Sequence, residues 1–109
     1  MSRLEKLQEF LALSPNDPFN LYAIAHEYVS QGQDAKAEPY FEKLLADHPA
    51  YTATYYHYGK LLERAAQPDK AAQQYRNGID AALAEKNRHA ARELRDALAQ
   101  LTGDDEDDF

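Results

Sequence analysis

Three of the four histidines, His26, His57 and His89, recur 31 and 32 residues apart. A neutral imidazole is a common zinc ligand. A protonated imidazole attracts anions, and because the ordinary pKa of histidine is about 6.5, such binding would depend on pH. If successive helices turned these residues to one side, three rings would converge on a divalent metal or on an acidic group. The alternative is three isolated surface histidines at tolerant polar positions. We favour this alternative, and therefore predict neither a metal site nor a cofactor.

Basic residues form a second pattern with possible chemistry. Lys60 and Arg64 lie one helical turn apart, and Arg88, Arg92 and Arg95 have the spacing of a stripe along one helix face. Arginine binds carboxylates through two parallel hydrogen bonds, so these residues would suit an acidic partner segment. The alternative is a solvated face whose charges are balanced by Glu63, Glu93 and Asp96.

The elements that must position these residues follow from a repeat of 34 residues. The step joins residues of similar size: Leu7, Phe41 and Tyr75; Leu11, Leu45 and Ile79; Pro15 and Pro49; Ala25 and Gly59; Tyr28 and Leu62; Ala37 and Ala71. A fixed period of this length indicates stacked supersecondary units.

Every long segment has helical periodicity, and none alternates as a strand does. Turn signals place the helices at about 2–13, 18–31, 34–47, 50–66, 68–84 and 87–101. Gly32 is suited to a left-handed helix end. Pro39 falls inside the third helix, where we expect either a slight bend or a late helix start.

The residues at the period resemble the tetratricopeptide repeat. The first copy reads Leu21-x2-Ile24-Ala25-x2-Tyr28, Ala37-x3-Phe41 and Pro49, and the second reads Tyr55-x2-Tyr58-Gly59-x2-Leu62 and Ala71-x3-Tyr75. The resemblance implies an all-α fold: a right-handed α-α superhelix of two hairpins between an N-terminal half-repeat helix and a C-terminal capping helix. We expect one domain over residues 1–102, with repeats at about 18–51 and 52–84 and the cap at about 87–101.

The family resemblance also implies the function, which is protein–protein interaction as an adaptor or scaffold. A peptide or helix of the partner would dock in a concave groove formed by the first helix of each repeat. The groove residues that we predict are Phe19, Tyr22, His26, Val29, Tyr56, His57, Lys60, Arg64, His89 and Arg92. Some family members clamp the carboxylates of a chaperone tail with Lys and Asn. Those positions hold Tyr22, His26, His57 and His89 here, which argues against that activity.

Self-association is the alternative function. Leu4, Phe10 and Leu13 on the first helix would pack against a second copy and form a homodimer.

Composition argues against several other classes of function. The chain has 109 residues, no cysteine and a net charge of −7, and it lacks a phosphate-binding glycine loop and a nucleophile motif, so we predict no enzyme activity. An acidic chain does not suit nucleic acid. No stretch is long and apolar enough for a membrane span, and the first six residues carry charges where a signal peptide would be apolar, so we expect a cytoplasmic protein.

Five of the negative charges are consecutive, in residues 104–108. The simplest interpretation of residues 103–109 is a disordered, solubilising tail. A sharper hypothesis is that this tail occupies the basic end of its own groove, or that of a neighbouring molecule, with Phe109 as its anchor.

Overall fold

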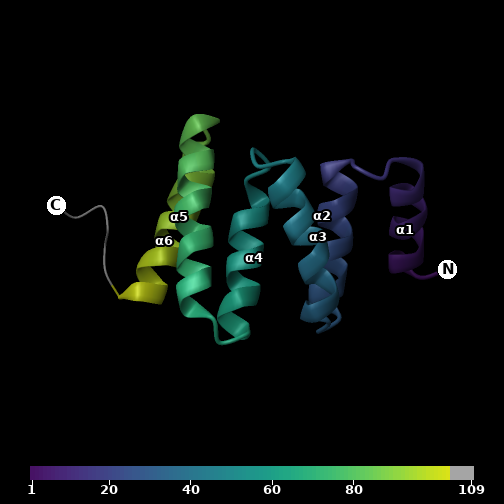
Figure 1. Ribbon diagram of the computed structural model, residues 1–109, viewed down its shortest axis with the longest axis horizontal. Coiled ribbons are helices and arrows are strands. Elements are labelled where there is room, and N and C mark those ends of the chain that lie inside the picture. The colour runs from purple at the N-terminus through teal and green to yellow at the C-terminus, as the bar shows by residue number, and fades with distance from the viewer. Residues whose placement is uncertain (104–109) are drawn as a thin grey trace. The chain divides into compact units, whose positions relative to one another are not determined.

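A computed structural model describes residues 1–103 of the chain. Within these residues the structure is entirely helical, which confirms the predicted fold class (Figure 1). The six helices are α1 (Arg3–Leu13), α2 (Pro18–Ser30), α3 (Asp34–Asp47), α4 (Ala53–Arg64), α5 (Pro68–Ala84) and α6 (Arg88–Thr102). None of them is long and apolar enough to cross a membrane. The predicted acidic tail, apart from Gly103, lies outside the described residues.

Side chains cap three of the helices at their first residues. Ser2 and Glu5 form a capping box before α1, with both hydrogen bonds at 3.1 Å. Asp17 accepts a hydrogen bond from the backbone N–H of Phe19, and Pro18 follows it at the first position of α2. These caps explain why α2 begins where the sequence predicts it.

A left-handed residue follows α2, α4 and α5, as it does α6 at Gly103. Gly32, Ala66 and Lys86 have φ angles of 74°, 59° and 58°. In each case the next residue donates a backbone hydrogen bond to the carbonyl five residues back, for example Gln67 to Leu62 at 2.9 Å. The prediction of a left-handed end at Gly32 is confirmed, and Ala66 repeats it without a glycine.

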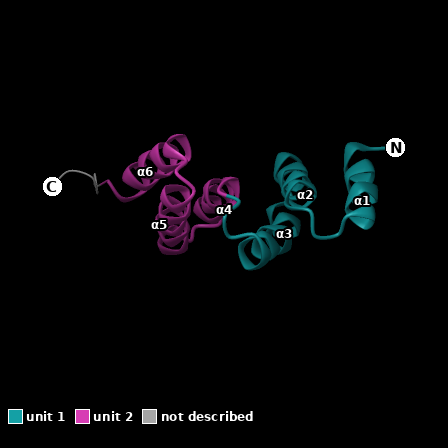
Figure 2. Cartoon of the chain, turned by 90° about the horizontal axis from the view of Figure 1, so that it is seen from above, with its two compact units in different colours: residues 1–51 teal, residues 52–109 magenta. Residues whose placement is uncertain are grey.

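The chain divides into two compact units, Met1–Tyr51 and the part that begins at Thr52 (Figure 2). In the first unit, α1 packs on α2, and α2 packs on α3. Its core consists of Leu7, Leu21, Ile24, Ala25, Ala37, Phe41 and Leu44. Ala25 and Ala37 are fully buried, and their small side chains let α2 and α3 approach closely.

In the second unit, α5 packs against both α4 and α6, and α4 also contacts α6. Two glycines lie where these helices approach one another closely. A Cβ atom on Gly59 would lie 2.2 Å from Tyr75 Cε1, and one on Gly78 would lie 2.5 Å from Tyr55 Cβ. Both positions therefore exclude any side chain, because the space is already filled by an aromatic residue of the opposing helix.

The structure corrects one predicted helix boundary and excludes one of two alternatives that the sequence left open. The fourth helix was expected from residue 50 to residue 66, but α4 begins at Ala53 and ends at Arg64. The residues before it form a turn in which the N–H of Tyr51 bonds to the carbonyl of His48. A late start of the third helix is also excluded, because α3 begins at Asp34 and continues through Pro39.

Candidate protein-interaction surfaces

Helix α4 presents two different faces because its polar and apolar residues follow the helical period. Tyr55, Tyr58 and Leu62 are buried in the core of the second unit. Tyr56 and His57 are half-buried on the other side. The face that carries Tyr56 and His57 is therefore available for contact with a ligand.

The first turn of α6 supplies the opposite wall. Asn87 caps this helix by accepting a hydrogen bond from the N–H of Ala90 at 3.0 Å. His89 lies in this first turn, and its Nε2 lies 2.7 Å from Oε1 of Glu93, one turn further along the helix; both side chains are exposed. The pairing orients the imidazole of His89 along the helix surface.

Between these two walls lies a cleft of about 320 Å³, which we call the α4–α6 cleft. It is lined by Thr52, Ala53, Tyr56, His57, Asn87, His89, Ala90, Glu93 and Leu94. Leu94 is buried, so it forms an apolar floor, while imidazole, amide and carboxylate groups stand at the rim. This arrangement suits an apolar side chain whose backbone is held by polar contacts.

Tyr56 is held in place by a chain of neighbours. Its ring lies 5.3 Å from that of His57 and 6.4 Å from that of Tyr75, and Lys60 Nζ lies 5.5 Å from its centroid. Lys60 also pairs with Glu63 at 3.6 Å. The lysine predicted for the groove is therefore engaged by two neighbours on its own helix.

The hydroxyl of Tyr75 donates a hydrogen bond to Glu63 from inside the core. Burial, followed by this hydrogen bond and the charge of Glu63, raises the pKa of Tyr75 far above its ordinary value. The phenol therefore stays protonated and remains a donor at neutral pH.

A separate aromatic cluster lies in the first unit. The ring of Tyr22 lies 5.7 Å from that of Tyr51 and 6.0 Å from that of His26. Burial and the neighbouring Tyr51 raise the pKa of Tyr22. Val29 is half-buried, whereas Phe19 is 65% exposed and does not serve as a core residue.

The predicted site residues thus fall into several groups. Tyr56, His57 and His89 share the α4–α6 cleft, and His26 belongs to the other unit. Arg64 is exposed at the end of α4, and Arg92 lines a different depression, between α5 and α6. No group of three or more metal-ligating side chains within residues 1–103 is placed to hold a metal ion.

Sequence reasoning missed several residues of the cleft, among them the cap Asn87, the partner Glu93 and the floor Leu94. Asn87 was visible as a helix start, and Leu94 as part of an apolar stripe. Their common location was hidden because the sequence does not show which side of α6 contacts α4.

The arrangement of paired antiparallel helices, with equivalent small and large residues 34 positions apart, defines a helical-hairpin repeat protein. The solution NMR structure of a tetratricopeptide repeat domain protein from Salinibacter ruber is 39% identical, with a TM-score of 0.78 over 82% of this chain and 90% of that chain. The chain belongs to the tetratricopeptide repeat family.

Two further structures are similar. A crystal structure of a tetratricopeptide repeat domain protein from Salinibacter ruber is 39% identical, with a TM-score of 0.76 over 80% of this chain and 98% of that chain. The solution structure of a protein from Bordetella parapertussis has the same fold, at 22% identity and a TM-score of 0.81 over 99% of this chain and 94% of that chain. No protein-family model and no curated protein matches the sequence. Membership of the family makes the chain a protein-interaction module in general terms.

Proposed function

We propose that the chain acts by binding, not by catalysis, and that a peptide or helix of its partner inserts an apolar side chain into the α4–α6 cleft. The observation that carries this proposal is the depression of about 320 Å³ that has Leu94 as its floor and Tyr56 at its rim. Its volume lies near the lower end of the range of ligand pockets, about 300–1,000 Å³, which suits an anchor side chain.

Tyr56 is the residue expected to contribute most to binding. Tyrosine combines a large apolar ring with a hydroxyl and is enriched among residues that dominate interface energies. The contacts with His57 and Lys60 hold the ring before a partner arrives, so less conformational freedom is lost on binding. The rim carries His89 next to Glu93, so the cleft itself favours neither an acidic nor a basic partner.

A second contact region is proposed for the predicted groove residues of the first unit, Phe19, Tyr22, His26 and Val29. The cluster of Tyr22 with Tyr51 offers an aromatic surface there. Replacing Tyr22 with alanine tests this region separately from the cleft.

Peptides selected from a random phage-displayed library on the wild-type protein provide the test. Titrated into ¹⁵N-labelled protein, they are expected to shift the amides of residues 52–57 and 87–94. Tyr56→Ala should weaken binding at least about tenfold, which corresponds to a loss of about 1.4 kcal/mol or more of binding free energy. A loss of this order is typical of residues that dominate an interface. Phe10→Ala, which removes an exposed ring on α1, is the matched control and should leave the affinity unchanged.

Selected peptides that shift other amides, or that bind Tyr56→Ala as tightly as wild type, would refute the cleft as the binding site.

Self-association through α1 is a second candidate, because this helix exposes large apolar residues. Phe10 is 55% exposed and Leu13 is 83% exposed. Sedimentation equilibrium from micromolar to near-millimolar protein is the test. A dimer that Leu13→Glu dissociates and Tyr56→Ala does not would support this candidate, and a monomer throughout the range would reject it.

A further inference from the structure

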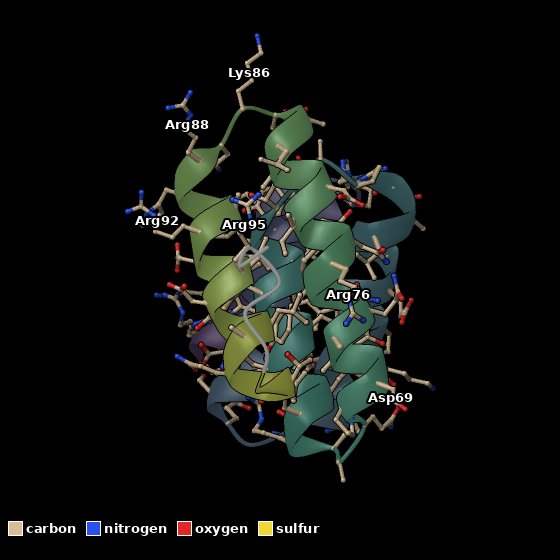
Figure 3. All side chains as sticks on the ribbon, turned by 90° about the vertical axis from the view of Figure 1, so that its left-hand side faces the viewer. Asp69, Arg76, Lys86, Arg88, Arg92 and Arg95 are labelled. Atoms are coloured by element: carbon tan, nitrogen blue, oxygen red, sulfur yellow. The ribbon has the colours of Figure 1, made fainter. Side chains whose placement is uncertain are left out.

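A depression separate from the α4–α6 cleft lies between α5 and α6. It is lined by Leu83, Arg88, Ala91, Arg92, Arg95 and Asp96 and has a volume of about 380 Å³. We call it the arginine groove. Figure 3 shows Arg88 and Arg92 projecting from one side of α6, with Arg95 between α6 and α5. The cleft uses other residues of the same helix, namely His89 and Glu93, so the two surfaces are distinct.

The positions of these arginines are unfavourable for α6 itself. Arg88 is the first residue of the helix, where the positive end of the helix dipole repels a cation. Arg92 follows it at i+4, and like charges at this spacing destabilise a helix by about 0.2–0.5 kcal/mol. Neither Arg88 nor Arg92 has an ion-pair partner within residues 1–103. Among the residues that line the groove, Asp96 is the acidic one, and the nearby Glu93 lines the α4–α6 cleft and pairs with His89 instead.

The end of the groove at the first turn of α6 holds an apolar side chain as well as Arg88. Leu83, in the last turn of α5, is 48% exposed, although it lies beside the buried Ala91. The aliphatic stems of the arginines add to this apolar surface. A ligand suited to the whole groove therefore carries negative charges followed by one large apolar side chain.

We propose that residues 104–109 of this chain, Asp-Asp-Glu-Asp-Asp-Phe, bind in the arginine groove, with their carboxylates on Arg95 and Arg92 and Phe109 against Leu83. This segment lies outside the described residues, and its sequence has the required chemistry in the required order. Arginine contacts with carboxylates are charge-assisted and often bidentate, so five acidic residues offer several equivalent pairings.

The distances permit this docking. With a rise of 1.5 Å per residue, Arg95 lies about 12 Å and Arg92 about 16 Å along α6 from Gly103. Six extended residues span roughly 20 Å, which brings the last of them level with the first turn of α6 and with Leu83. Gly103 has a φ angle of 76°, the left-handed conformation that turns a chain back at a helix end.

Docking within one molecule would give the segment a high effective concentration, of millimolar order for a short connection. The arginine groove would then be occupied in the isolated protein, and an acidic partner would have to displace the segment. This role is independent of the α4–α6 cleft and does not require the proposed function to be correct.

The test compares ¹⁵N spectra of the full chain with those of a full-length variant in which the five acids are neutralised: Asp104→Asn, Asp105→Asn, Glu106→Gln, Asp107→Asn and Asp108→Asn. The expected differences lie at residues 83–96 and at the Arg92 and Arg95 side chains. They should be independent of protein concentration and should disappear in 0.5 M salt, where the screening length is only about 4 Å. Phe109→Ala should change the signals of Leu83 and Ala91.

A charge reversal in the groove provides the second arm. In Arg92→Glu, neutralising the five acids should no longer alter residues 83–96, whereas in the control Lys36→Glu, on the first unit, it should alter them as in wild type. Differences confined to residues next to the substitutions, or located in the α4–α6 cleft, would overturn the proposal. Differences that grow with protein concentration would also overturn it, because they would show that a second copy occupies the groove.

Discussion

Ala66 ends α4 in a conformation that is costly for alanine, so replacing it with glycine is expected to stabilise the protein. Its φ angle is 59°, and its N–H bonds to the carbonyl of Glu63 at 3.0 Å. Gly32 ends α2 in the same way, 34 residues earlier, with a φ angle of 74°. The two repeats therefore contain one helix end with glycine and one without it.

The magnitude follows from two opposing terms. The left-handed conformation costs a residue with a Cβ atom about 1–2 kcal/mol. Glycine loses more backbone entropy on folding than alanine, by roughly 0.5–1 kcal/mol. The side chain of Ala66 is exposed, so little packing is lost. Ala66→Gly should therefore raise the free energy of unfolding by about 0.5–1 kcal/mol.

Gly32→Ala is the reverse experiment and should lower the free energy of unfolding by a similar amount. A Cβ atom added at Gly32 would meet no atom within 4 Å, so steric overlap does not complicate the comparison. Urea unfolding followed by circular dichroism should show the two midpoints moving in opposite directions at constant m-value. The double variant should lie close to wild type, because the two sites are distinct. Midpoints that moved in the same direction would refute the reasoning.

Three further predictions concern the second unit. Gly59→Ala should lower the free energy of unfolding, measured by urea titration, by about 3 kcal/mol, because the added Cβ atom would lie 2.2 Å from a ring carbon of Tyr75. A loss of less than about 1 kcal/mol would show instead that the helices separate easily. Thr54→Val should be neutral or stabilising by up to about 1 kcal/mol, since its hydroxyl is fully buried without a hydrogen-bond partner; clear destabilisation would indicate a bond to that hydroxyl. The raised pKa of Tyr75 means that its contribution to stability is complete below about pH 10 and is lost above it, as the unfolded state releases its proton first. Unfolding free energies between about pH 10 and 11 should therefore fall less steeply for Tyr75→Phe than for wild type, and equal slopes would contradict the shift.

The repeat made much of the fold predictable from the sequence. The helices α3 and α5 begin and end at the predicted residues, because a turn signal lies on each side of them. The start of α4 was predicted three residues too early. Thr52 precedes this helix without a side-chain capping bond, and the ring of Tyr51 packs on Tyr22 instead of continuing a helix. Such a contact between distant residues has no local signal.

The functional surfaces were less predictable, because periodicity locates the apolar face of a helix but does not identify the neighbour on each side of it. From the sequence, the helical period places His89 and Arg92, three residues apart, on the same polar face of α6. In the structure, α6 contacts both α4 and α5, so His89 lines the α4–α6 cleft and Arg92 lines the arginine groove. Leu83 stands 34 residues after Pro49, where the repeat would place a proline, and in the structure it is exposed beside the arginines.

The two repeats differ at three linked positions, and the difference connects packing to the candidate site. The first repeat has Ala25, Val29 and Phe41 where the second has Gly59, Glu63 and Tyr75. Tyr75 fits over Gly59 because glycine has no Cβ atom, and its hydroxyl reaches Glu63. Phenylalanine has no hydroxyl for such a bond, and valine has no acceptor, so the first repeat needs neither the glycine nor the acid.

In the second repeat, the contacts that begin at Tyr75 continue from the core to the surface. Glu63 accepts the hydrogen bond from Tyr75 and also pairs with Lys60, which in turn lies over the ring of Tyr56. Tyr56 borders the α4–α6 cleft. The presence of Tyr75, where the first repeat has Phe41, therefore also helps to fix the orientation of Tyr56 at the surface. In the first repeat, the equivalents of Tyr75 and Glu63 are Phe41 and Val29, which lack the hydroxyl and the carboxylate that make this hydrogen bond.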